Sequence, residues 1–198
     1  SSHMSLYQLT VEDGTVFGQR HQAGHLKGLP SEDLGADFYD ITQEICESHG
    51  LPAYEISNHA REGQESRHNL LYWQSDDFAG IGPGAHGRLT LNGQRHATAA
   101  LREPAKWLSQ ARHGKIQDID AVLSVSEVQT EFLLMGLRLR EGISSQRFHA
   151  LAGFDLPAAK LAYLIDLGML EREGDKIRAT ATGRPILNSV LLELVSDL

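Results

Sequence analysis

One short segment of the chain combines an imidazole, an amide, a phenol and an indole: His68-Asn69-Leu70-Leu71-Tyr72-Trp73. An imidazole can ligate a metal ion or a haem iron, and aromatic rings can stack on a flat macrocycle. The same residues also suit a histidine bonded to a backbone carbonyl beside two core aromatics. A plain core would favour aliphatic residues, so the segment is the first candidate binding site.

His68 has no HxH, HxxxH or cysteine neighbour that would complete a zinc site. A single axial ligand to haem iron needs no such neighbour, so His68 is the one residue that we predict as a metal ligand. Asn69, Tyr72 and Trp73 are predicted to line the same cofactor site.

Two flanking runs add further candidates. Downstream, the run 80–87 is rich in glycine and ends near His86, a second candidate ligand. This run is neither a phosphate-binding loop nor a dinucleotide fingerprint. It either lets the backbone approach a ligand closely or forms a bulged turn. Upstream, Tyr54 and Glu55 lie on a strand-like stretch, where Glu55 faces either a cavity or solvent.

Composition limits the classes of function. The net charge is −8 over 198 residues, and residues 121–198 carry eight Lys or Arg against ten Asp or Glu. Nucleic-acid binders usually present a basic face, so we expect no nucleic-acid partner. No stretch reaches the roughly 20 apolar residues of a membrane span. Cys46 is the only cysteine, which fits a cytoplasmic location and cannot hold an iron–sulfur cluster.

Residues 1–5 read as an expression-tag remnant, and residues 6–120 as an α/β segment. In the first part of that segment we expect a strand at 6–11, a loop to residue 30, a helix capped by Ser31 and ending at Gly50, and a strand at 53–57. In its second part we expect a strand at 78–81 and a hairpin in which 88–91 pairs with 94–98 through a turn at Asn92-Gly93. A helix at 105–114 follows, with Trp107 and Leu108 in the core. His21, His25 and His59 are expected in solvated loops.

Residues 121–198 read as a mostly helical domain. The expected elements are a helix capped by Ser126, a helix from Ser144 or Ser145, a helix stopped by Gly168, a hairpin at 170–179 and a helix from Thr182. Three helices, a β-wing and a closing helix make a winged-helix-like order. The predicted class is therefore α+β.

Four runs occur in an order that resembles a known family: 7–15, 54–58, 68–73 and 80–86. They are similar to the C-terminal half of the oxygen-independent coproporphyrinogen III oxidase-like radical SAM proteins, and most similar to its haem-chaperone branch. Residues 131–142 and Thr182-Gly183-Arg184 resemble the family's small C-terminal domain. The resemblance implies the end of a partial radical SAM barrel and a connecting sheet, followed by the winged-helix-like domain.

The resemblance implies a parent protein that binds S-adenosylmethionine and an iron–sulfur cluster through CxxxCxxC, a motif absent here. The chain alone should therefore be inactive. His68, Asn69, Tyr72 and Trp73 match the segment associated with haem binding, and Tyr54 and Glu55 match a strand near the cofactor site. Ser66 stands where many relatives have cysteine, and His59 where many have an aromatic residue.

Three functions follow as hypotheses. The first is haem or porphyrin binding of the haem-chaperone type by a C-terminal fragment. The second is oxidative decarboxylation of coproporphyrinogen III by the intact protein, with Arg67 and Arg88 as the nearby cations for propionates. The third is a winged-helix nucleic-acid-binding module. Removing most of a barrel would expose strand edges, so we also expect homodimers or larger species.

Overall fold

The computed structural model describes residues 1–196, which form two compact units. The first unit is Ser1–Glu65, and the second begins at Ser66. Each unit is described by itself.

The first unit holds a two-stranded antiparallel sheet and two helices. Its elements are β1 (His3–Ser5), α1 (Val16–Gln22), α2 (Glu32–Ser48) and β2 (Asn58–Ala60). Ser31 caps α2, as predicted, because its side chain accepts a hydrogen bond from the amide of Leu34 at 3.2 Å. Gly50 follows this helix with a φ of +71°, a backbone conformation that glycine adopts at little cost.

Several predictions in this unit were wrong. Residues 6–11 contain no strand, because β1 comes before them and pairs with β2. The expected loop contains α1, which is capped by Thr15. The expected strand at 53–57 is a single bridge at Ala53 followed by bends, and the strand begins at Asn58. His59 lies in that strand with 1% of its surface exposed, so it is not solvated.

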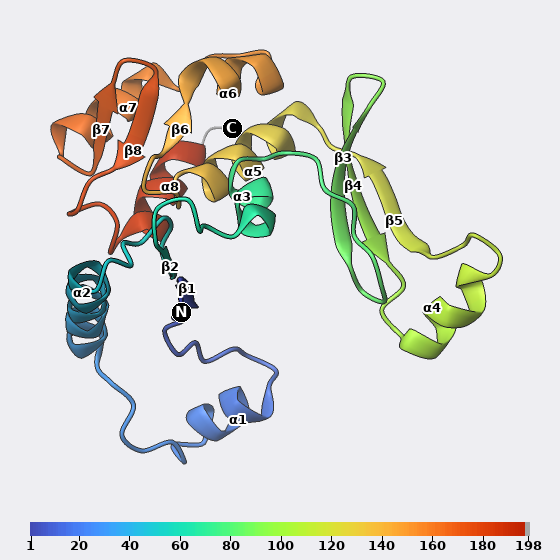
Figure 1. The fold of residues 1–198 in the computed structure, drawn as a ribbon, viewed down its shortest axis with the longest axis horizontal. Helices are drawn as coiled ribbons and strands as arrows, with labels where there is room; N and C mark the ends of the chain where they lie inside the picture. Colours follow the sequence, from blue (N-terminus) through green and yellow to red (C-terminus); the bar gives the residue numbers. More distant parts are fainter. Residues whose placement is uncertain (197–198) are drawn as a thin grey trace. The chain divides into compact units, whose positions relative to one another are not determined.

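The second unit begins with α3 (Arg67–Trp73) and a three-stranded antiparallel sheet in the order β3-β4-β5 (Figure 1). The strands are β3 (His86–Leu91), β4 (Gln94–Ala100) and β5 (Gln117–Val122), and α4 (Pro104–Ala111) connects the last two. The predicted hairpin is confirmed, with Asn92 and Gly93 at φ values of +52° and +77°. β5 was not predicted, and the expected strand at 78–81 is a single bridge between Phe78 and Arg88.

The rest of this unit is mostly helical and includes a second three-stranded sheet in the order β6-β8-β7. Its elements are α5 (Val125–Gly136), β6 (Ile143–Ser144), α6 (Ser145–Ala152), α7 (Ala158–Asp166), β7 (Leu170–Glu173), β8 (Lys176–Ala179) and α8 (Leu187–Val195). The order of helices and hairpin is as predicted. The first cap is Ser124, which forms a capping box with Glu127, and not Ser126. The last helix begins at Leu187, five residues after Thr182.

The core of this helical part is apolar and nearly free of solvent. Its most deeply buried side chains are Leu133, Leu137, Phe148, Leu170, Ile177 and Leu194. The rings of Phe132 and Phe148 meet edge to face, with centroids 5.6 Å apart. Leu108 was predicted as core but is 59% exposed, because it lies on the outer face of the short helix α4.

The chain is thus a mixed α and β protein with three small sheets in its described part, as the α+β class requires. Across residues 1–196, no helix combines the length and the apolar character needed to cross a membrane. The barrel end and the winged helix are finer assignments and stay predictions.

Candidate functional site

Helix α3 places His68 and Tyr72 one turn apart on the same face. Ser66 begins this helix by accepting a hydrogen bond from the amide of Asn69 at 3.3 Å. His68 is exposed, and its Nε2 is hydrogen-bonded to the Tyr72 hydroxyl. The two ring centroids are 4.7 Å apart, and the Tyr72 ring meets Phe78 edge to face at 4.5 Å. These three rings form a continuous row, the α3 aromatic row.

Trp73 is one position further along and faces a different neighbour. The guanidinium carbon of Arg138, which follows α5, lies 5.7 Å from the centre of its ring. The indole N–H is buried and has no hydrogen-bond partner within residues 1–196. Trp73 therefore packs beside α5, whereas His68 remains open to solvent.

The end of α3 is fixed by a turn that Ser75 makes possible. Ser75 has a φ of +53° and donates its amide to the carbonyl of Tyr72 at 3.0 Å. The amide of Asp76 bonds to the carbonyl of Leu71 at 2.9 Å. This pair of bonds is a Schellman motif, with a serine where glycine is usual. The turn directs two consecutive carboxylates, Asp76 and Asp77, away from the helix.

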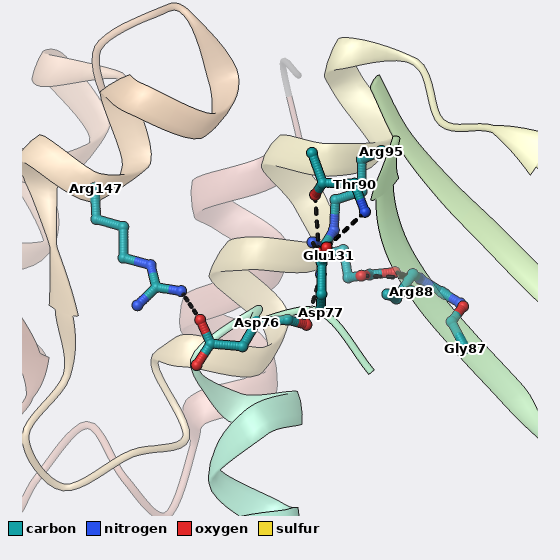
Figure 2. A network of polar contacts seen from close by, with 8 residues as sticks. All are labelled: Asp76, Asp77, Gly87, Arg88, Thr90, Arg95, Glu131 and Arg147. Atoms are coloured by element: carbon teal, nitrogen blue, oxygen red, sulfur yellow. Dashed lines mark hydrogen bonds and ion pairs between the residues drawn. The ribbon is translucent and has the colours of Figure 1, made fainter. Parts of the chain in front are cut away.

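Asp76 and Asp77 bind two different parts of the second unit (Figure 2). Asp76 pairs with Arg147 of α6 at 2.5 Å. Asp77 accepts hydrogen bonds from the amide and hydroxyl of Thr90, at 2.7 and 2.8 Å, and pairs with Arg95 at 3.1 Å. Burial acts to raise the pKa of Asp77, but the bonds from Thr90 and the charge of Arg95 lower that pKa below its ordinary value. The segment after α3 is therefore anchored to β3, β4 and α6.

Arg88, a predicted propionate-binding cation, is committed to a carboxylate within the protein. Its Nη2 lies 2.7 Å from Glu131 of α5, and its Nε donates to both oxygens of that side chain (Figure 2). Arg67 is the first residue of α3 and is exposed.

Tyr54 and Glu55 belong to the first unit, where both serve local structure. Glu55 is 1% exposed, and its Oε1 accepts bonds from the amide and hydroxyl of Ser57, at 2.8 and 3.0 Å, and from the Asn58 amide group at 2.6 Å. The Tyr54 hydroxyl lies 3.0 Å from Nε2 of His3. The carboxylate of Glu55 thus holds a turn, and solvent does not reach it.

His86 begins β3 opposite Ala99 and is exposed. In the described part of the chain, it makes no hydrogen bond or ring contact with the α3 aromatic row. The neighbouring glycines permit close backbone packing: a Cβ on Gly80 would lie 2.4 Å from the carbonyl oxygen of His86. A Cβ on Gly87 would lie 2.6 Å from the Thr98 hydroxyl. This geometry supports the bulged-turn interpretation of the glycine run.

Residues 1–196 contain no group of three or more His, Cys, Asp or Glu side chains that could hold a metal ion. A hollow of about 580 Å³ lies among α6, α7 and β7, lined in part by His149, Asp155 and Arg172. None of the predicted site residues lines it. Sequence reasoning missed Arg138, Ser75, Asp76 and Asp77. Two consecutive aspartates three residues after Trp73 were the available signal for the last two.

Three comparisons agree on the relatives of this chain. Residues 123–186 match the family described as the HemN C-terminal domain. The chain is 35% identical to the mitochondrial radical S-adenosyl methionine domain-containing protein 1 of Bos taurus, with 99% of this chain and 47% of that protein covered. It is 32% identical to the heme chaperone HemW of Bacillus subtilis, with 100% of this chain and 52% of that protein covered.

A solved structure has the same fold at low identity. It is reported as coproporphyrinogen III oxidase (HemN) from Escherichia coli, a radical SAM enzyme, and matches with a TM-score of 0.68 and 16% identity, over 100% of this chain and 48% of that one. The chain spans about half the length of the relatives that it matches. Together these matches identify it as a C-terminal portion of the HemN/HemW-like radical SAM family.

Proposed function

We propose that this chain binds haem or a related porphyrin as part of a haem-chaperone-type protein, with His68 as the iron ligand. The observation that carries the proposal is the exposed imidazole of His68 at the end of the α3 aromatic row. An axial haem ligand needs one accessible nitrogen, and neighbouring rings favour a flat macrocycle. The names of the HemW relatives support the same ligand class.

The residues suit haem but not the other cofactors expected of the parent protein. An iron–sulfur cluster needs about three or four thiolates, and the chain has one cysteine, which is buried. We therefore assign the cluster and S-adenosylmethionine to the part of the relatives that this chain does not span. We also propose a cytoplasmic location and homodimers that form through exposed strand edges. Light scattering tests the dimers by measuring the molar mass in solution.

Haem titration of the chain, followed in the Soret region, tests the proposal. We expect saturable binding by the wild type and a loss of affinity of at least about tenfold in His68→Ala, because removing even a group that supports a metal ligand costs that much. His86→Ala is the matched control and should bind as the wild type does. Equal binding by the wild type and His68→Ala would contradict the assignment of the ligand.

Oxidative decarboxylation of coproporphyrinogen III by the intact protein is the alternative from the enzyme class. It requires product formation by the cluster-loaded protein, whereas the chaperone proposal requires haem binding without turnover. Measuring both on the same preparation separates the two.

A further inference from the structure

Two hydrogen-bond donors lie together beside α3 without an acceptor. One is the buried indole N–H of Trp73, and the other is the guanidinium of Arg138 over the same ring. Within residues 1–196, that guanidinium makes no hydrogen bond or ion pair. A buried donor without a partner costs free energy, so the indole N–H of Trp73 calls for an explanation, whereas the Arg138 guanidinium is half-buried.

Arg138 differs in this respect from the three arginines that bind carboxylates close to α3 and the sheet, although Arg184 also has guanidinium nitrogens without a partner within residues 1–196. Arg88, Arg95 and Arg147 each pair with a carboxylate of the protein. Arg138 is partly buried as well, yet an aromatic face is its neighbour in place of an anion. A cation–π contact holds the guanidinium in place while leaving its N–H groups available.

We propose that Arg138 binds a carboxylate of the porphyrin, with Trp73 holding its guanidinium in position. The inference rests on the proposed function and names the group that would recognise the acidic side chains of the ligand. A carboxylate only accepts hydrogen bonds, and a guanidinium presents a planar fork that matches its two oxygens. One carboxylate beside this ring would supply the acceptor that the half-buried guanidinium lacks.

The acidic residue closest to Arg138 along the chain after it is Glu141, and its contacts are with other residues. Glu141 follows Arg138 by three residues and contacts the Gln74 amide at 3.3 Å and the Lys176 ammonium at 3.8 Å. Both contacts are at the long end of their range, so this carboxylate is weakly held. Within residues 1–196, Glu141 therefore supplies no acceptor to Arg138 or Trp73.

The experiment compares haem with haem dimethyl ester, in which both propionates are neutral, by Soret titration. We expect the wild type to prefer the free acid by about tenfold, the range of a hydrogen bond to a charged group. Arg138→Gln should lose this preference and bind the ester as the wild type does. Arg138→Lys should keep part of it, because the charge remains but the fork is lost.

Arg112→Gln is the matched control, since it removes one exposed positive charge of the same unit at the end of α4 and should keep the preference. Circular dichroism checks that each variant folds. If Arg138→Gln does not fold, the comparison of Arg138→Lys with the wild type is the test. An unchanged preference in both Arg138 variants overturns the inference while haem binding stands. Loss of the preference in Arg67→Gln would also overturn the inference, because the carboxylate would then bind at the exposed start of α3. A wild type that binds neither ligand overturns the proposed function itself.

Discussion

At the scale of single residues, the hydrogen bond between His68 and Tyr72 limits which imidazole nitrogen is available to coordinate iron. The bond occupies Nε2, so an iron atom that binds this nitrogen must displace the hydroxyl. Tyr72→Phe keeps the ring beside His68 and Phe78 and removes the competing hydroxyl. We expect this variant to bind haem more tightly, by about threefold to tenfold, since a hydrogen bond of this kind is worth roughly 0.5–1.5 kcal/mol.

Soret titration measures this effect, and a Tyr72→Leu variant separates it from loss of the aromatic ring. Weaker binding by Tyr72→Phe would mean that the hydroxyl orients the imidazole for binding through its other nitrogen.

The residues of the candidate site were predicted from their types and from the family resemblance, whereas helix α3, which brings two of them together, was not predicted. His68 and Tyr72 lie four residues apart, and any helix brings such a pair together. Arg138 lies more than 60 residues further along the chain, and its place over Trp73 depends on how α3 and α5 pack. Glu55 was ambiguous because residues 54–57 form bends in place of the expected strand, and its partners are Ser57 in those bends and Asn58 at the start of β2.

At the scale of elements, the start of α6 depends on a carboxylate from another element. Asp175, in the turn between β7 and β8, accepts bonds from the hydroxyl of Ser145 at 2.8 Å and the amide of Gln146 at 2.9 Å. A bond from the hydroxyl of Ser144 and these two bonds lower the pKa of Asp175 below its ordinary value.

This lowered pKa makes stability depend on pH in a defined direction. The carboxylate binds its proton more weakly in the folded state, so its contribution is present above the unfolded pKa, near 3.9, and is lost as the pH falls through the folded pKa. Asp175→Asn should therefore lower the free energy of unfolding at pH 7. Between about pH 4 and pH 2, the free energy of unfolding of this variant should fall less than that of the wild type. Urea unfolding at several pH values measures this.

Glu193→Gln is the control for Asp175→Asn, because this exposed carboxylate on α8 makes no side-chain hydrogen bond within residues 1–196. If both variants changed the pH dependence equally, overall charge and not the turn at Asp175 would be the cause.

Elements with strong local signals were predicted well. Asn92-Gly93 and Glu173-Gly174-Asp175 fix hairpins through their own backbone preferences, and Ser31 and Ser144 cap helices through bonds three residues away. Strands that depend on distant partners were missed or misplaced. β1 pairs with a strand more than 50 residues later, and β5 is an edge strand whose only strand partner in the described sheet is β4. Alternation alone identified neither pairing.

At the scale of the second unit, a few ion pairs connect the sheet to the helices. Arg88 joins β3 to α5 through Glu131, and Asp76 joins the end of α3 to α6 through Arg147 (Figure 2). The side chains of Arg88 and Glu131 are 22% and 24% exposed, so this pair is shielded more than an ordinary surface pair. These links predict that the sheet and the helical part unfold together.

The two tryptophans of the chain allow this cooperativity to be measured, because Trp73 ends α3 and Trp107 lies in α4 beside the sheet. Trp73→Phe and Trp107→Phe each leave one fluorescent reporter. We expect both to show the same urea midpoint, as a single cooperative transition requires. Adding Glu131→Gln should lower the free energy of unfolding by about 1–2 kcal/mol, between the values of exposed and buried pairs, and should separate the two midpoints. Glu193→Gln in the same backgrounds should leave them together. If the two midpoints already differ before Glu131 is changed, the sheet and the helices unfold independently. The ion pairs would then orient the two parts without making them one cooperative unit.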